Sequence, residues 1–321
     1  MKIAFTLVAA LGAALLPLAA QSQAFPSKPI RVIVPYGAGG TSDILARQVG
    51  PKITETTGQP VIVENKPGAN GNVGAEFVAK STPDGYTVLL ADIGALCISP
   101  SVYPKLPFDP IKDFAPVVMV SYSPHVLAVH PSVPVNSVKE LVEFAKAKPD
   151  TLNFAISGTG GAPHLAGIEF AQRTGVKWAY IPYKGGAPAV ADVVAGQANV
   201  LFNGMLATYP QVRNGKLRAL AVSSAKRVSA APDLPTVAET LPGFETGSWQ
   251  GVVAPPGTPR EVVAKLNAEF TRALNLPDIK EKLVAQGTEV RTDTPESFGR
   301  FMREEVAKWS KVVKESGAKF E

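Results

Sequence analysis

Two glycine-rich segments with hydroxyl side chains each follow a strand pattern and lead into a helical pattern: residues 34–43 and residues 156–164. A helix N-terminus presents unpaired N–H groups and a positive dipole end, which favour a carboxylate or phosphate. Glycine lets the backbone approach an anion, although tight turns need it too. Because the pattern occurs twice, we interpret both segments as anion-binding loops of one cleft, holding both ends of a dicarboxylate, or one carboxylate and one polar tail. Their hydroxyl donors are Thr41, Ser42, Ser157 and Thr159.

Several residues near these loops are further candidates for the site. Tyr36 and Tyr183 stand at predicted strand ends and would line the cleft, with core packing as the alternative. His164 falls in the first turn of the second helix, where it would either donate to a bound carboxylate or cap the helix. Asp43 and Arg47 are four residues apart on one helix and should pair. That pairing predicts a supporting role for Arg47 rather than direct ligand contact.

A nucleotide site is the main competing interpretation of the two loops, and the spacing argues against it. The dinucleotide pattern G-x-G-x-x-G requires a third glycine where this chain has Ser42 in the first loop and Pro163 in the second. A phosphate loop of the G-x-x-x-x-G-K-[ST] kind is absent from the sequence. Only Glu64, at the end of the second predicted strand, imitates the acid that binds a ribose.

The sequence shows no organised catalytic or metal centre. It contains no G-x-S-x-G elbow, and none of its histidines stands in a zinc-binding pattern. We therefore predict no enzyme, no metal and no cofactor. His125 and His130 flank a predicted long strand and are interpreted as structural residues. Cys97 lies in an apolar stretch and is predicted to be a buried, unreactive thiol.

The N-terminus has the pattern of a secretory signal. Lys2 precedes an apolar run over residues 3–20, and the small residues Ser22 and Ala24 precede a cleavage site after Ala24. No other segment is apolar enough to span a membrane. The net charge of +5 is spread along the chain and is not clustered as in a nucleic-acid-binding protein. The sequence thus predicts an exported, periplasmic protein without a nucleic-acid partner.

Short β-branched runs alternate with helix-period segments, which indicates an α/β fold with parallel strands and crossover helices. Strands are expected at 30–34, 61–63, 86–90, 115–129, 152–156, 178–182, 199–202, 216–222 and 248–253. Helices are expected from 41 to 58, at 75–80, 137–147, from 163, and at 187–195, 261–274 and 295–315.

Two of the predicted strands suggest a two-lobed chain. The run 115–129 is rich in β-formers without a helix, as a strand passing between lobes would be, and 248–253 is a plausible return strand. We therefore expect residues 25–124 plus 250–321 to form the first lobe and residues 125–249 the second. The ligand cleft would lie between the lobes, because domain interfaces are preferred ligand sites.

The order of short motifs along the mature chain resembles a known family. The matching stretches are Lys28–Tyr36, Gly39–Asp43, Val63–Gly68, Asp84–Tyr86, Tyr103–Pro107, Ser157–Gly160, His164–Gly167, Pro182–Gly185, Ala187–Pro188, Pro235–Glu239 and Ala254–Pro259. This pattern is similar to that of the extracytoplasmic solute receptors of tripartite tricarboxylate transporters, the Bug or TctC family.

The resemblance implies a two-lobed type II periplasmic-binding-protein (Venus flytrap) fold whose ligand carboxylates are held by backbone amides, hydroxyls and water. It places Tyr36, Gly40, Thr41, Ser42 and Asp43 in the first binding loop, and Ser157, Gly158, Thr159, Gly160 and His164 in the second. It also implies a monomer that delivers its ligand to membrane transporter subunits or a sensor kinase.

Asn203 departs from the family pattern, because many relatives have an aspartate at this position. The lost charge favours a ligand without an amino group: a dicarboxylate, hydroxy acid or aromatic carboxylate. The predicted function is accordingly that of an extracytoplasmic solute-binding protein for a small carboxylate. The alternative is an exported hydrolase or transferase acting on a carboxylate ester.

Overall fold

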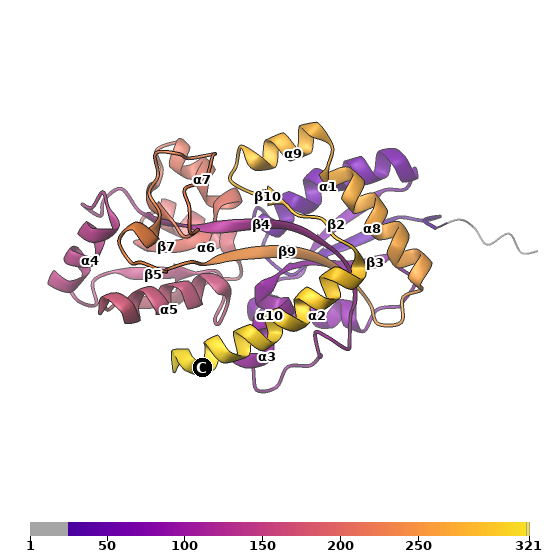
Figure 1. Cartoon of the computed structure of the whole chain (residues 1–321), viewed down its shortest axis with the longest axis horizontal. Coiled ribbons are helices and arrows are strands. Elements are labelled where there is room, and N and C mark those ends of the chain that lie inside the picture. The colour runs from indigo at the N-terminus through magenta and orange to yellow at the C-terminus, as the bar shows by residue number, and fades with distance from the viewer. Residues whose placement is uncertain (1–24, 319, 321) are drawn as a thin grey trace, which may run out of the picture.

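A computed structural model describes residues 25–318 and residue 320. The predicted signal and its cleavage site after Ala24 lie outside the described residues. None of the helices in the described part is both long and apolar enough to cross a membrane. The strands form one mixed sheet in the order β2-β1-β3-β9-β4-β7-β5-β6, to which β8 and β10 add by pairing with β4. The helices cover both faces of this sheet (Figure 1).

The first lobe is built around three parallel strands, β1 (Ile30–Val34), β2 (Val61–Asn65) and β3 (Thr87–Asp92). Its helices are α1 (Thr41–Thr57), α2 (Asn72–Ala79), α3 (Ser99–Val102), α8 (Arg260–Leu274), α9 (Pro277–Val284) and α10 (Pro295–Ser316), with a one-turn helix at Ala69–Gly71, a π-helical turn at Gly94–Ile98 and the short strand β10 (Glu289–Val290). Cys97 is fully buried in the π-helical turn, which confirms the predicted structural thiol.

The second lobe contains β5 (Asn153–Ile156), β6 (Ala179–Pro182), β7 (Val200–Gly204) and β8 (Arg218–Val222). Its helices are α4 (Val138–Ala147), α5 (Ala162–Thr174), α6 (Gly186–Val194) and α7 (Met205–Arg213), with one helical turn at Val237–Glu239. The core of this lobe is aromatic: Phe170 stacks on Trp178, and Phe202 stacks on Phe244. Each lobe therefore has a hydrophobic core of its own.

Two long antiparallel strands, β4 (Ala115–Val129) and β9 (Gly247–Ala254), run through the centre of the molecule and connect the lobes (Figure 1). The first part of β4 pairs with β9, from Ala115 opposite Ala254 to Pro124 opposite Gly247. From His125 onward β4 pairs instead with β7 and β8 of the second lobe. The change of partners occurs between Pro124 and His125, where the sequence predicted the passage between lobes. The residue bounds of the lobes stay a prediction.

The structure confirms the predicted strands and helices within a few residues, and besides the four-residue helix α3 it adds two longer helices that the sequence analysis did not include. One is α7, which contains Pro210 and buries only Met205, Leu206 and Thr208, so its helical pattern is weak. The other is α9, a short helix of eight residues after a helix of fifteen.

The central strand β9 leaves no room for a side chain at Gly251. A Cβ atom there would lie 2.2 Å from Cζ of Phe298, a fully buried ring on α10. We expect Gly251→Ala to lower the free energy of unfolding by about 1–3 kcal/mol, measured by urea denaturation, because a close-packed core resists added volume. Phe298→Leu should relieve that overlap, so the double variant should be more stable than the sum of the two single effects predicts. Additive effects would contradict this explanation.

Candidate functional site

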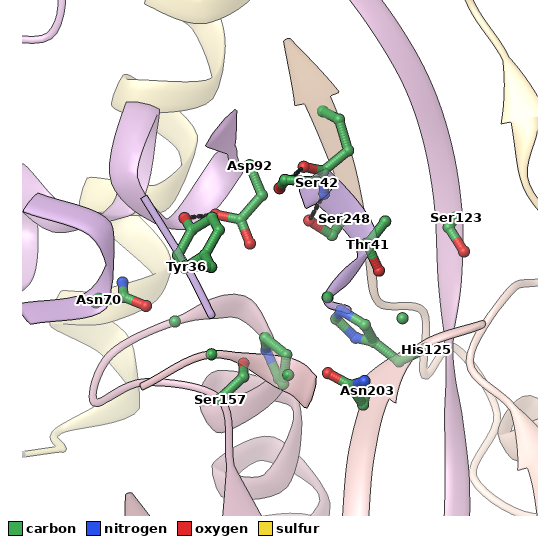
Figure 2. A pocket seen from close by; sticks show the side chains of 17 residues that line it. Tyr36, Thr41, Ser42, Asn70, Asp92, Ser123, His125, Ser157, Asn203 and Ser248 are labelled. Carbon is green, nitrogen blue, oxygen red and sulfur yellow. Dashed lines mark hydrogen bonds between the residues drawn. The ribbon is translucent and has the colours of Figure 1, made fainter. Parts of the chain in front are cut away.

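A cleft between the two lobes is lined by side chains and backbone from both (Figure 2). The lining residues of the first lobe and the central strands are Tyr36, Gly40, Thr41, Ser42, Asn70, Asp92, Ser123, His125, Ser248 and Gln250. Those of the second lobe are Ser157, Gly161, Pro163, Gly185, Gly186, Asn203 and Gly204. Among these lining residues of the described chain, none is a lysine or arginine.

Four helix N-termini converge on the cleft, and each begins after a glycine that lines it: Gly40 before α1, Gly161 before α5, Gly185 before α6 and Gly204 before α7. None of these four ends has a side-chain cap. Their first N–H groups therefore lack the usual intrahelical or capping partners, and four positive dipole ends face one space. An anion is the ligand that such an arrangement favours.

Glycine is required at these positions by close approach. A Cβ atom on Gly204 would lie 2.8 Å from Oγ1 of Thr41, and one on Gly161 would lie 2.8 Å from Oδ1 of Asn70. Gly185 has a φ of 120°, which side-chain-bearing residues rarely adopt. The glycines thus allow polar side chains of the first lobe to reach the backbone of the second.

The hydroxyl donors predicted from the sequence lie at different places. Thr41, Ser42 and Ser157 line the cleft. The hydroxyl proton of Ser42 already has an acceptor, because its Oγ donates to Oε1 of Gln250 at 2.6 Å. Thr159 lies instead in an adjoining pocket with Gly158 and Tyr183, which shares Tyr36, Asn70, Ser157 and Gly185 with the cleft.

The remaining predicted residues of the two loops hold the loops in shape. Asp43 accepts hydrogen bonds from the Gly39 N–H, from Nε of Arg47 at 3.0 Å and from Nδ2 of Asn65 at 3.0 Å. Burial opposes ionisation of Asp43, but these hydrogen bonds outweigh it and lower the pKa of the carboxyl. Arg47 pairs with Asp43 as predicted and does not line the cleft.

His164 serves the second loop in the same way. Its Nδ1 accepts a hydrogen bond from the Gly160 N–H at 2.9 Å, and neither residue lines the cleft. Burial lowers the pKa of His164 to about 4, so its ring is neutral at neutral pH. A neutral Nδ1 acceptor fixes the turn that carries Gly161.

Tyr36, which is buried, and Asp92, which is half-buried, form a pair at one side of the cleft. The Tyr36 hydroxyl donates to Oδ1 of Asp92, which also accepts from the Gly94 N–H at 2.8 Å. Burial raises the pKa of Asp92 and raises that of Tyr36 well above its usual value. Tyr36 is therefore a neutral phenol, and Asp92 brings an acidic group into the cleft.

His125, interpreted from the sequence as structural, has a ring that lines the cleft and is fully buried. Its Nδ1 lies 3.1 Å from Oγ1 of Thr246, while Nε2 has no partner. Burial lowers its pKa to about 3, so the ring is neutral. Asn203 also lines the cleft, and its Nδ2 donates to Oγ1 of Thr208 at 3.0 Å.

Sequence reasoning missed Asn70, Asp92, Ser123, Ser248 and Gln250. Asn70 and Asp92 follow or end the strands β2 and β3, and the rule that ligands bind beyond the carboxyl ends of parallel strands was the available signal. Ser123, Ser248 and Gln250 lie on the crossing strands. Their orientation depends on strand register, and no local sequence pattern marks that register.

The two neutral histidines predict a specific pH dependence of stability. Because the folded-state pKa values of His125 and His164 lie below the ordinary 6.5, only the unfolded chain gains protons at first as the pH falls. The contribution of these two neutral rings to the free energy of unfolding is fully present above about pH 6.5 and is lost progressively below it. We expect a loss of about 1–3 kcal/mol between pH 7.5 and 5.5 in urea unfolding.

The double variant His125→Gln/His164→Gln should lose most of this pH dependence. His130→Gln is the control, since it leaves both buried rings in place and removes only a ring bonded to Ser132. An unchanged slope in the double variant would show that other groups cause the acid sensitivity.

Comparison with known proteins places the chain and its fold in a family. Residues 45–318 match the sequence profile of the tripartite tricarboxylate transporter family receptor, TctC. The solved structure of the periplasmic binding protein BugD is 36% identical, with a TM-score of 0.89, over 92% of this chain and 99% of that one. An R. palustris protein solved with adipate is 36% identical, with a TM-score of 0.89, over 91% of this chain and 98% of that one.

MatC from Rhodopseudomonas palustris, solved with bound malate, is 33% identical, with a TM-score of 0.85, over 90% of this chain and 100% of that one. These matches confirm the predicted two-lobed periplasmic-binding-protein fold and the resemblance found in the sequence. With a family profile and relatives that each cover most of its length, the chain belongs to the tripartite tricarboxylate transporter receptor family.

Proposed function

We propose that this protein is an extracytoplasmic solute receptor that captures a small carboxylate and presents it to a tripartite tricarboxylate-type transporter or to a sensor. The observation that carries the proposal is the convergence of four uncapped helix N-termini on one interlobe cleft. These N-termini supply N–H donors and the positive ends of four helix dipoles. The lining residues include no cationic side chain, so the backbone is the source of positive charge for the anion.

The residues that we assign to ligand binding follow from this geometry. Thr41 and Ser157 offer hydroxyls to a ligand. Tyr36 lines the cleft from the first lobe and Asn203 from the second, and the backbone amides of the first helical turns lie beside them. Two relatives support a carboxylate as ligand, because the R. palustris protein was solved with adipate and MatC with malate. The family profile likewise supports a transporter partner.

Capture without catalysis fits the side chains of the cleft better than ester hydrolysis or transfer. In residues 25–318, the rings of the two buried histidines are bonded through Nδ1 to Thr246 and to the backbone of Gly160, and neither ring bonds to a serine hydroxyl. A serine nucleophile needs such a base to take its proton. We also propose that this protein is exported through a cleaved N-terminal signal, in line with a relative described as periplasmic.

Hydrogen bonds join the lobes beside the cleft, as expected of a receptor in its closed form. The Gly37 N–H donates to the Lys184 carbonyl at 3.1 Å, and the Tyr103 hydroxyl donates to the Thr159 carbonyl at 3.0 Å. Both hydrogen bonds join one lobe to the other. We therefore propose that ligand binding is coupled to closure of the lobes.

The direct test measures binding to the protein exported by a bacterial host and then unfolded and refolded, which removes any acid carried through purification. A bound carboxylate at about 100 times its Kd should stabilise the fold by about 2.7 kcal/mol, a rise of several degrees in Tm. The dimethyl ester of the same acid should give no shift, since it lacks the charge that the helix ends favour. Small-angle scattering should show a smaller radius of gyration with the acid bound.

Equal binding of acid and ester would contradict the anion-binding site. Hydrolysis of the ester, detected as released methanol and abolished by Ser157→Ala, would favour the exported hydrolase instead.

A further inference from the structure

A second cavity lies behind the crossing strands, on the face of the sheet opposite the ligand cleft. Side chains alternate between the two faces of a strand. Ser123 and Ser248 stand opposite each other in the β4–β9 ladder and line the cleft, so the neighbouring pair, Tyr122 and Trp249, faces the second cavity. Its volume is about 700 Å³. Sites for small molecules usually have about 300–1,000 Å³, so this cavity, which we call the rear groove, is large enough for one.

The walls of the rear groove come from both lobes. One face of α10 in the first lobe and one face of α5 in the second stand on either side of the crossing strands. The lining includes Phe301, Glu305, Trp309 and Val312 from α10, and Leu165 and Glu169 from α5. Near their C-terminal ends the two helices meet, where Nε2 of Gln172 donates to the Ser316 carbonyl at 2.6 Å (Figure 1). A molecule in the rear groove would therefore contact both lobes.

One buried carboxylate fixes the two indole rings of the rear groove. Glu305 is 7% exposed, and its Oε2 accepts from Nε1 of Trp249 at 3.2 Å and from Nε1 of Trp309 at 3.1 Å. Its Oε1 accepts from Nζ of Lys308 at 3.1 Å. The two rings are thus held in position without any ligand, which lowers the conformational cost of binding one.

The aromatic rings suit an apolar group and attract positive charge. Tyr122 and Phe301 add two rings to the indoles. Two of the rings already lie under cations of the chain itself: Tyr122 is 4.9 Å from the guanidinium of Arg291, and Trp309 is 5.7 Å from the ammonium of Lys308. Both distances are in the range of a cation–π interaction, so the groove is an environment that accepts cations.

The charges around the rear groove favour a cation as its occupant. Four glutamates line it, against one arginine and one lysine. Arg291 is already paired with Glu289 at 2.9 Å, and Lys308 with the buried carboxylate described above. Of the four lining glutamates, Glu245 alone forms no ion pair in the part of the chain that the structure describes. Burial, and next the Glu245 carboxylate, raise the pKa of Tyr122, so unpaired negative charge acts on this ring.

The position of the rear groove couples it to the movement of the lobes. The groove and the ligand cleft lie on opposite faces of the strands that connect the lobes, so a rotation that opens the cleft brings α5 and α10 together. An occupant between these helices opposes that rotation. Thr246 makes the two sites neighbours, because it lines the groove while its Oγ1 lies 3.1 Å from Nδ1 of His125, which lines the cleft.

We propose that the rear groove is a second ligand site, which takes an organic cation with an apolar body and thereby favours the closed lobes. The ammonium group would lie near Glu245, and the apolar body against Phe301, Trp309 and Val312. The site itself is independent of the proposed function, whereas its effect on carboxylate binding rests on it.

Calorimetric titration of the refolded protein, in the absence of any acid, tests the site. The probe is 3-phenylpropylammonium, which carries one charge and one apolar ring. 3-Phenylpropanol lacks the charge and propylammonium lacks the ring, so each should bind about tenfold more weakly. Equal binding of the ammonium and the alcohol, or no binding of the ammonium, would overturn the proposal.

Three variants locate the bound cation. Glu245→Gln should weaken the ammonium about fivefold and leave the alcohol unchanged, because it removes only a charge. Trp309→Leu should weaken both about tenfold, because it removes a ring. Glu281→Gln, an exposed position on α9 outside the groove, loses the same charge and should change neither. Thermal unfolding of each variant shows that it folds, and unchanged binding in folded Glu245→Gln and Trp309→Leu would contradict a site in the rear groove.

The effect on the lobes is measured without and with an acid. The ammonium alone should lower the radius of gyration in small-angle scattering. With the ammonium bound, whichever of malate and adipate the protein binds should bind about fivefold more tightly, and linkage requires the acid to tighten the ammonium by the same factor. Propylammonium at the same concentration controls for ion pairing in solution.

The outcomes separate this inference from the proposed function. An unchanged radius of gyration and an unchanged acid affinity would overturn the effect on closure. Binding of the ammonium, sensitive to Glu245→Gln, without binding of either acid would support the second site while removing support for the proposed function.

Discussion

The antiparallel ladder between β4 and β9 is the constraint on which the other parts of the structure depend. It runs from Ala115–Ala254 to Pro124–Gly247, with register shifts between Pro116 and Val118 and between Met119 and Ser121, and the sheet of the first lobe joins it through β3. β4 then continues into the second lobe as the partner of β7 and β8. The same strands that connect the lobes also place Ser123, His125, Ser248 and Gln250 in the cleft. The hydrogen bonds that connect the two lobes therefore also position these four cleft residues. A shift in the register of β4 against β9 would change both the connection and the lining of the cleft.

The cleft attracts an anion without using a cation, and this choice has energetic consequences. A buried lysine or arginine would require its own neutralising partner whenever the cleft is empty, because an unpaired buried charge is expensive. Helix N-termini and neutral donors carry only partial charges, which water can satisfy in an empty cleft and an anion in a filled one. Burial keeps His125 and His164 neutral, so neither ring becomes a fixed charge near the ligand at neutral pH. The preference for an anion is built into the backbone rather than into a single replaceable side chain.

Much of the fold and part of the site could be predicted from local sequence patterns. The α/β alternation, the crossing strand at 115–129 and the two glycine-rich loops are local signals, and Tyr36, Thr41, Ser42, Ser157 and Asn203 do line the cleft. The errors concern residues whose role depends on distant partners. His125 looked structural because nothing near it in sequence suggests that it pairs with Gly204 and faces the gap beside Thr41. The role of Asn70 could not be predicted locally, because it depends on the turn after β2 reaching Gly158 and Gly161 of the other lobe.

Asn203 illustrates how the charge of a binding site depends on more than one position. The missing aspartate at 203 removes a formal charge from that position, which led us to expect a ligand without an amino group. The structure shows that the amide nitrogen of Asn203 is bound to Thr208, and that an acid enters the same cleft from Asp92 at the end of β3. The number of acidic groups in the cleft is thus set by strands from both lobes. The chemistry of the cleft is accordingly a property of both lobes together, because Asp92 reaches it from the first lobe and Asn203 from the second.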